Sequence, residues 1–334
     1  MEIYAGLDVH SEFTYGTIMD EKGNQMWEAK VPTTEEGFRS LFLKFQGKHK
    51  IKAVFEASRN WNYIASLLRQ QSVDFVMAHH LRVRAIASAR IKTDKIDSKI
   101  LAHLLRTDLI PQSYMPNEEI VQLRGLVRYR VRTGRLAAQI KNSIRAILAR
   151  EGKKCGWTDP TGTRAEIWLK HLQLTPQNRR ELNHSLSLLA NLKQEISELD
   201  KQIKAEALKR PDVALICSIP GFAEYSSLLI LSEIGDLGRF ETPEQLAAFS
   251  GLISSTYQSS STFSQGRITK QGSKWLRCIL VECATIAVRK ENRLQRFYLR
   301  LKRKKGHQKA IVATARKALM IIWTLLQKQQ VFQP

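Results

Sequence analysis

Hydrophobic and polar positions alternate through the first third of the chain. Five short segments show this period of two or are wholly apolar, and each predicts a β-strand: residues 2–8, 14–19, 25–31, 51–55 and 73–77. Short connections separate the first three segments, so we expect an antiparallel meander. Helical spacing of apolar residues follows the third, fourth and fifth strands, at residues 33–45, 60–71 and 94–105. The predicted order is therefore three strands, helix, strand, helix, strand, helix.

This order is that of the ribonuclease H fold, an α/β sheet with helices on its faces. In such sheets, catalytic groups gather at the ends of strands. Four acidic residues stand at such places, at the ends of the first and fourth strands and in the first turn of the last helix: Asp8, Glu56, Asp94 and Asp97. Four converging carboxylates would hold two divalent cations ~3.5–4 Å apart for phosphodiester chemistry. Oxygen ligands favour Mg²⁺, or Mn²⁺, over softer metals.

Each carboxylate also has an alternative role that needs no metal. Asp8 could cap a turn, and Glu56 could be an ordinary surface residue. Asp94 and Asp97 project from the same face of a helix, where acidic residues in the first turn also suit the helix dipole. We favour the metal site because the four occur together in this order. Histidines of the same region are interpreted as surface or groove residues unconnected with a metal: His10, His79, His80 and His103.

The charge of the chain narrows the class of partner. Its 334 residues include 53 Lys and Arg against 31 Asp and Glu, a formal net charge of +22. This excess indicates a polyanionic partner, for which nucleic acid is the usual case; a basic protein of the membrane surface is the alternative. No segment reaches the ~18 apolar residues of a membrane span, and the first residues begin a strand rather than a signal peptide. The four cysteines form no CxxC pair, so we expect neither a zinc knuckle nor a disulfide framework, and a reducing cytoplasm fits.

The middle of the chain predicts two long helices. Residues 121–150 carry no acidic residue, whereas a solvated helix usually mixes signs. We therefore expect this helix to bind phosphates, through Arg124, Arg128, Arg135 and Lys141. Glycine and proline break residues 151–176, which predicts a loop or hinge. Leucine and isoleucine then repeat every seven residues from Leu182 to Ile203, the pattern of a coiled coil, either a helical hairpin within the chain or the seam of a dimer; packing inside one domain is the alternative.

The last third predicts helices around a serine-rich segment. Residues 218–222 open a helix at residues 224–234 and resemble a helix-hairpin-helix module, although Ala223 stands where a second glycine is usual. Residues 254–264 are rich in serine, a composition typical of a flexible loop. Residues 289–317 are strongly basic. Interleaved apolar residues favour a nucleic-acid surface there over a solvated tail, with the candidate ligands Arg300, Arg303 and Lys304.

Several of these segments match one known family. The chain resembles the DEDD recombinases of insertion-sequence family one-ten, to which the Piv-type DNA invertases are related, in five places: residues 6–10 (GLDVH), 55–58 (FEAS), 92–97 (KTDKID), 248–252 (AFSGL) and 266–272 (GRITKQG). The resemblance implies a RuvC-like DEDD catalytic domain at residues 1–110, a basic helix with a coiled-coil connector at residues 111–208, and a C-terminal transposase domain at residues 209–334. It also implies recombination guided by a structured RNA.

The same resemblance implies a serine nucleophile. In the family, a serine two residues after an aromatic residue or histidine attacks the DNA, and Tyr257 places this serine at Ser259. Ser260 and Ser261 follow where glycine is usual, so the register could shift by one or two. A serine hydroxyl needs activation by a base or a metal, which the carboxylate-bound metals would supply if the two domains meet.

Cationic groups are also needed next to the negatively charged non-bridging oxygens of the attacked phosphate. Arg267 and Lys270 are the nearest candidates, although Lys270 could instead cap a helix or contact a distant phosphate. We predict an RNA-guided, serine-dependent DNA recombinase, the transposase of an insertion element. Its partners would be donor and target DNA, the guide RNA and further copies of itself in a dimer or tetramer. It would act away from membranes, in the bacterial cytoplasm and at the nucleoid.

Two other functions compete with this prediction. The first is a RuvC-like structure-specific DNA nuclease that cuts with a metal-activated water and forms no covalent intermediate. The second is a nucleic-acid-binding scaffold whose site is inactive. A covalent protein–DNA adduct would separate the recombinase from the nuclease, and metal-dependent strand cleavage would exclude the scaffold.

Overall fold

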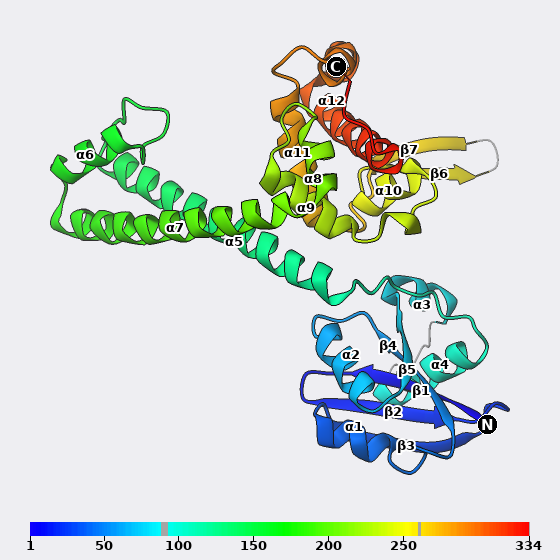
Figure 1. Cartoon of the computed structure of the whole chain (residues 1–334). Helices are drawn as coiled ribbons and strands as arrows, with labels where there is room; N and C mark the ends of the chain where they lie inside the picture. The colour runs from blue at the N-terminus through cyan, green and yellow to red at the C-terminus, as the bar shows by residue number, and fades with distance from the viewer. Residues whose placement is uncertain (88–92, 260–261, 334) are drawn as a thin grey trace. The chain divides into compact units, whose positions relative to one another are not determined.

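The computed structural model describes residues 1–87, 93–259 and 262–333, and divides the chain into two compact units, Met1–Met115 and Pro116–Pro334. The first unit is built on a five-stranded sheet with strand order β3-β2-β1-β4-β5 (Figure 1). The strands are β1 (Glu2–Val9), β2 (Phe13–Met19), β3 (Gln25–Pro32), β4 (Lys50–Glu56) and β5 (Asp74–Ala78). All five strands were predicted from the alternation of apolar residues, each to within two residues at either end.

Pairing within the sheet is mixed. The strands β1, β2 and β3 pair antiparallel, which confirms the predicted meander, whereas β1 pairs parallel with β4 and β4 with β5. The register aligns Leu7 with Phe55, so the next residues, Asp8 and Glu56, lie side by side at the carboxyl ends of neighbouring parallel strands.

Helices cover both faces of this sheet. They are α1 (Glu35–Phe42), α2 (Trp61–Gln70), α3 (His80–Ile86) and α4 (Asp94–Arg106). Phe38 and Ile64 of α1 and α2 belong to one hydrophobic cluster, and Val83 and Leu101 of α3 and α4 belong to another, on the other side. The short helix α3 was not predicted.

The second unit begins with a pair of long helices, α5 (Glu118–Arg150) and α7 (Pro176–Leu208), which pack against each other along their length (Figure 1). Leu182, Leu189 and Ile203 of the seven-residue repeat are buried. The two helices therefore form a helical hairpin within the chain, which was one of the predicted arrangements for the repeat. The coiled-coil geometry of the pair stays a prediction. The expected loop at residues 151–176 is wrong in part, because it contains the helix α6 (Thr163–His171), held by the buried Ala165 and Leu169.

The rest of the second unit is mainly helical and shares one core with the ends of α5 and α7. Its elements are α8 (Pro211–Cys217), α9 (Glu224–Ile234), the 3₁₀ turn η1 (Leu237–Arg239), α10 (Pro243–Ser250), β6 (Ser254–Ser259), β7 (Thr262–Ile268), α11 (Lys274–Ala287) and α12 (Arg293–Lys328). The described part of the serine-rich segment, expected to be a flexible loop, instead belongs to the two-stranded antiparallel ribbon β6–β7.

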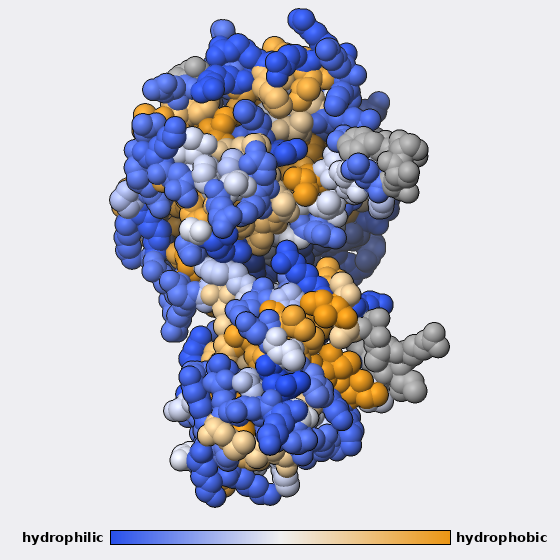
Figure 2. Space-filling model, turned by 90° about the vertical axis from the view of Figure 1, so that its right-hand side faces the viewer, coloured by the Kyte–Doolittle hydropathy of each residue, from blue (hydrophilic) through white to orange (hydrophobic). Residues whose placement is uncertain are grey.

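The long helix α12 is the one described helix that is apolar enough in part to span a membrane, with a window of mean hydropathy 1.3. Half of that window is buried inside the unit, so it packs as a core helix. Hydrophilic residues cover most of the face seen in Figure 2, with smaller hydrophobic patches between them.

Candidate active site

The start of α4 lies against β1 because a glycine stands at the contact. A Cβ atom at Gly6 would lie 2.0 Å from the carbonyl oxygen of Ser98, so a side chain at this position would push the helix away. The hydroxyls of Thr17 and Ser98 join the helix to β2 over 2.7 Å. Thr93 caps the helix, its Oγ1 accepting a hydrogen bond from the Ile96 amide at 3.3 Å. This packing places the first turn of α4 beside the end of β1.

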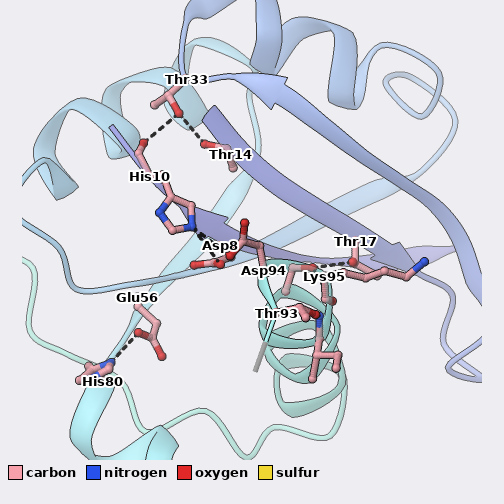
Figure 3. Close-up of polar contacts among 12 residues, drawn as sticks. Asp8, His10, Thr14, Thr17, Thr33, Glu56, His80, Thr93, Asp94 and Lys95 are labelled. Atoms are coloured by element: carbon pink, nitrogen blue, oxygen red, sulfur yellow. Dashed lines mark hydrogen bonds and ion pairs between the residues drawn. The ribbon is translucent and has the colours of Figure 1, made fainter. Parts of the chain in front are cut away.

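Three candidate site side chains meet at this end of the sheet (Figure 3). His10 Nε2 lies 3.3 Å from Asp8 Oδ2 and 3.4 Å from Asp94 Oδ1. The backbone of His10 is fixed as well, because its carbonyl accepts a hydrogen bond from the hydroxyl of Thr33 at 3.0 Å. His10 is exposed, as expected of a surface or groove residue, but it stands between two of the predicted carboxylates, so its expected lack of connection with a metal stays open.

The carboxylate of Asp8 is the most desolvated of the group. Burial raises the pKa of Asp8 above its ordinary value; His10 opposes this shift, and the negative charges of Asp94 and Asp97 add to it. Asp97 thus acts on the same spot from the first turn of α4, three residues after Asp94. Desolvated like charges held this close are stabilised by a cation between them, so the electrostatics favour cation binding.

Glu56 has a different partner. Its Oε2 lies 2.6 Å from Nδ1 of His80, the first residue of α3, and Figure 3 shows the side chain turned towards His80. The structure thus brings Asp8 and Asp94 together through His10 and places Glu56 at the same sheet edge with a histidine of its own. His80, like His10, was predicted to be a surface or groove residue; it is exposed, and its pairing with a predicted catalytic carboxylate is a contact that the sequence did not indicate.

These side chains fit a divalent cation. One ligand atom from each of Asp8, His10 and Asp94 lies within 4.8 Å of the others. Carboxylate oxygens are the ligands of Mg²⁺, Ca²⁺ and Mn²⁺, whereas an imidazole also suits Zn²⁺ and Fe²⁺. The donor set therefore accepts a divalent metal, and the preference for Mg²⁺ or Mn²⁺ stays a prediction.

The predicted nucleophile lies on the ribbon of the second unit. Ser259 is the last residue of β6 and pairs with Thr262 of β7, while Tyr257 is 70% exposed. Ser260 and Ser261, the alternative positions for the nucleophile, lie outside the described residues. Arg267 lies on β7 and is exposed.

Two glycines hold the base of this ribbon. The backbone of Gly272 has φ +90°, and a Cβ there would lie 1.9 Å from the carbonyl oxygen of Phe249. Gly251 has φ +70° and would meet the carbonyl of Gln271 at 2.2 Å. Lys270, also at positive φ, donates its amide to the Gly251 carbonyl at 3.2 Å. The two motifs that the sequence singled out here therefore pack on each other, and positive φ with close backbone contact explains their glycines.

The residues predicted to bind nucleic acid fall into two groups. Arg124 donates to the carbonyls of Ser232 and Glu233 at the end of α9, and Arg128 forms two hydrogen bonds with the Glu233 carboxylate. Both guanidinium groups thus have structural partners inside the unit, and their predicted binding to phosphate competes with that role. Other members are exposed or pair at the surface: Arg135, Lys141, Arg267, Lys270, Arg300, Arg303 and Lys304.

Comparison with known proteins defines the class. The family model for DEDD transposases of the IS110 type matches residues 5–151, which include all four acidic positions. A second model, described as the transposase IS116/IS110/IS902 family, matches residues 213–299, which include the ribbon. These matches cover both the carboxylate site and the serine-bearing segment, and they make the protein a transposase. The chain belongs to the IS110 family of insertion-sequence transposases.

Relatives across much of the chain agree. A protein named "Transposase for insertion sequence element IS1111A", from Coxiella burnetii, is 27% identical over 253 residues, covering 72% of this chain and 68% of the relative. A "Probable family 20 transposase" from Pseudomonas aeruginosa is 25% identical over 292 residues, covering 84% of this chain and 85% of the relative.

Proposed function

We propose that this transposase is an RNA-guided DNA recombinase that cuts and rejoins strands with a serine nucleophile and a divalent-metal carboxylate site. The observation that carries the proposal is the meeting of Asp8 and Asp94 at His10, with Asp97 three residues further along in the first turn of the same helix. The strand order β3-β2-β1-β4-β5, with β1, β4 and β5 parallel, supports a ribonuclease H fold of the RuvC type, in which such an edge carries the catalytic carboxylates.

The proposed metal ligands are the carboxylates of Asp8, Glu56, Asp94 and Asp97, with His10 and His80 as their neighbours. A bound divalent cation supplies positive charge at a phosphate and lowers the pKa of a coordinated hydroxyl. The chain's own contribution is to hold the carboxylates in place. Gly6 and Thr93 fix the start of α4, and burial partly desolvates the carboxylate of Asp8.

The proposed nucleophile is Ser259. The ribbon supports this assignment because the end of β6 projects away from the helices of its unit (Figure 1), with Tyr257 largely exposed two residues earlier. Arg267 and Lys270 are the proposed cations for the attacked phosphate. Neither unit alone holds both serine and carboxylates, so the mechanism requires that they meet on the DNA, within one copy or between copies of a dimer or tetramer.

The guide RNA rests on the family resemblance, supported by the basic surface. Its test is direct: the protein purified from its host under low salt should carry one defined RNA, which sequencing would identify as transcribed from the element's non-coding end. If the protein carried only random cellular RNA, and nuclease removed it without loss of recombination, RNA guidance would be refuted. The proposed metal site would not be affected by that result.

The test of the carboxylate site is strand transfer by single variants. Asp94→Asn and Asp8→Asn remove charge but keep size, and each should abolish metal-dependent strand cleavage while DNA binding persists. Asp108→Asn is the matched control, since Asp108 is exposed at φ +54°, a conformation that asparagine tolerates well. Recombination at near-normal rate by the Asp94 variant would refute the site.

The proposed cytoplasmic location follows from a function on chromosomal DNA.

A further inference from the structure

The helix α12 is two helices joined at a sharp bend. Gly306 has φ 77° and ψ 170° inside this otherwise helical stretch, a conformation open to glycine and rare for other residues. The hydroxyl of Tyr298 lies 2.7 Å from Nδ1 of His307, which ties the two segments together across the bend. The bend brings residues before and after it to one surface pocket of about 430 Å³.

Four cationic side chains line this pocket. Arg293, Arg296 and Arg300 come from the first segment of α12, and Lys317 comes from the second. Among the described residues, no carboxylate forms an ion pair with any of the four. Four like charges without counter-charges repel each other at a cost, and an anion bound in the pocket would relieve that cost.

The pocket also contains an aromatic ring. Phe297 lies among the cations, with the Arg300 guanidinium 5.6 Å from its ring centroid. The adjacent face of the same helix is anchored in the core, because Leu294 is fully buried and Tyr298 is 6% exposed. Residues three, four and seven positions apart share one face of a helix, so Arg293, Arg296, Phe297 and Arg300 form one preformed surface.

We propose that this pocket binds an unpaired nucleotide of a nucleic-acid strand, with its phosphates on the arginines and Lys317 and its base stacked on Phe297. The size favours a nucleotide over a lone phosphate, because about 430 Å³ falls in the range of small-molecule sites, roughly 300–1,000 Å³. The ring favours an unpaired base, since bases inside a duplex stack on each other and expose no face. Aromatic stacking with a basic groove is the common means of binding single strands.

The proposal divides the basic residues predicted from the sequence. Arg300 lines the pocket, whereas Arg303 and Lys304 lie on the same helix outside it. It rests on the proposed function only in requiring that the chain handles nucleic acid. Its test measures binding and not strand transfer, so a failed serine mechanism would leave it standing, and its own failure would leave the carboxylate site standing.

The test is equilibrium binding of the full-length protein to a short single-stranded oligothymidine, the matching oligouridine and a duplex of equal charge, by fluorescence anisotropy at several salt concentrations. Phe297→Leu removes the ring but keeps apolar bulk, and should weaken single-strand binding about fivefold or more, the effect of one stacked base, with little change for the duplex. Phe297→Tyr keeps a ring and should restore the affinity.

The role of charge is tested by two double variants, each of which removes two positive charges. Arg296→Gln with Arg300→Gln should lower the slope of log affinity against log salt for the single strand by about 0.7 per phosphate released. Arg303→Gln with Lys305→Gln, outside the pocket, is the matched control and should not discriminate single strand from duplex. An effect on oligothymidine alone or oligouridine alone assigns the nucleotide to DNA or to RNA. Wild-type single-strand affinity of Phe297→Leu, or equal losses for both strand forms in the pocket variant, would overturn the proposal.

Discussion

The buried ion pair of Arg128 and Glu233 permits the sharpest prediction on stability. The Glu233 side chain is 2% exposed, and its carboxylate accepts two hydrogen bonds from Arg128, at 2.6 and 2.9 Å, and one from the Ser273 hydroxyl, at 2.7 Å. Ser273 also caps α11, directly after the glycine motif at the base of the ribbon. The perturbation is Arg128→Met, which keeps an unbranched apolar stem and removes the guanidinium group with its charge.

The size of the effect follows from burial. Removing one partner of a buried pair leaves the other charge uncompensated and typically costs about 3–5 kcal/mol. Arg128 itself is 34% exposed, and Ser273 would still donate to Glu233, so we expect the lower end, about 3 kcal/mol. For a unit of this size, that lowers the melting temperature by roughly 6–12 °C. Glu233→Gln should cost less, about 2 kcal/mol, because water can reach Arg128.

Calorimetry on the full chain measures this effect, and the double variant Arg128→Met with Glu233→Gln completes the cycle. Destabilisation by the double variant well below the sum of the two singles would confirm the coupling. The salt dependence of DNA binding provides a second readout, which a structural role should leave unchanged. The reasoning would be refuted by an Arg128→Met protein of wild-type stability whose salt slope is reduced, since Arg128 would then be a phosphate ligand.

Three further predictions concern other parts of the chain. Gly272→Ala should destabilise the second unit by more than about 1 kcal/mol through strain and collision with the Phe249 carbonyl, whereas Gly125→Ala on the open face of α5 should be neutral or stabilising; thermal unfolding of both variants checks this. Hydrogen bonds from Thr175 and Asn178 lower the pKa of Glu151 to about 2. The Glu151 carboxylate therefore contributes its full stabilisation above the ordinary glutamate pKa and loses it as the pH falls towards 2. In Glu151→Gln, the free energy of unfolding should therefore fall less steeply with decreasing pH over this range. DNA affinity should fall steeply with salt, by about 0.9 log units per log unit of salt for each duplex phosphate contacted; a flat dependence in titrations would mean that the net charge of +22 is not a binding surface.

Much of the first unit could be predicted because its strands bury one face or both, and burial leaves a readable pattern. The pattern failed where burial is slight. The helix α3 buries only Val83, and α6 lies among glycines and prolines that indicate a loop. The ribbon β6–β7 is exposed along much of its length, so hydrogen bonding rather than a hydrophobic face defines its strands, and its serine-rich sequence carries no strand signal.

The candidate site, too, could be predicted from the sequence only in part. Asp8 and Asp94 were predictable because each ends or begins a regular element. The contact of His10 with both depends on the turn after β1, where its amide donates to the Phe13 carbonyl at 2.9 Å, and its position two residues after Asp8 was the available signal. The partner of Arg128 could not be predicted, because Glu233 lies 105 residues away and nothing in its local sequence marks it as buried.

The covalent intermediate tests the central claim most directly. The wild-type protein, with the proposed guide RNA and a divalent metal, should become linked to one DNA end on a nicked substrate that traps the reaction, and the link should survive denaturation. Protease digestion and mass spectrometry should place the DNA on Ser259; a link at Ser260 or Ser261 would correct the register and keep the mechanism. Ser259→Ala should form no adduct and cut no strand. Efficient cleavage without any adduct, unchanged in Ser259→Ala, would contradict the account and leave the carboxylate site as that of a nuclease.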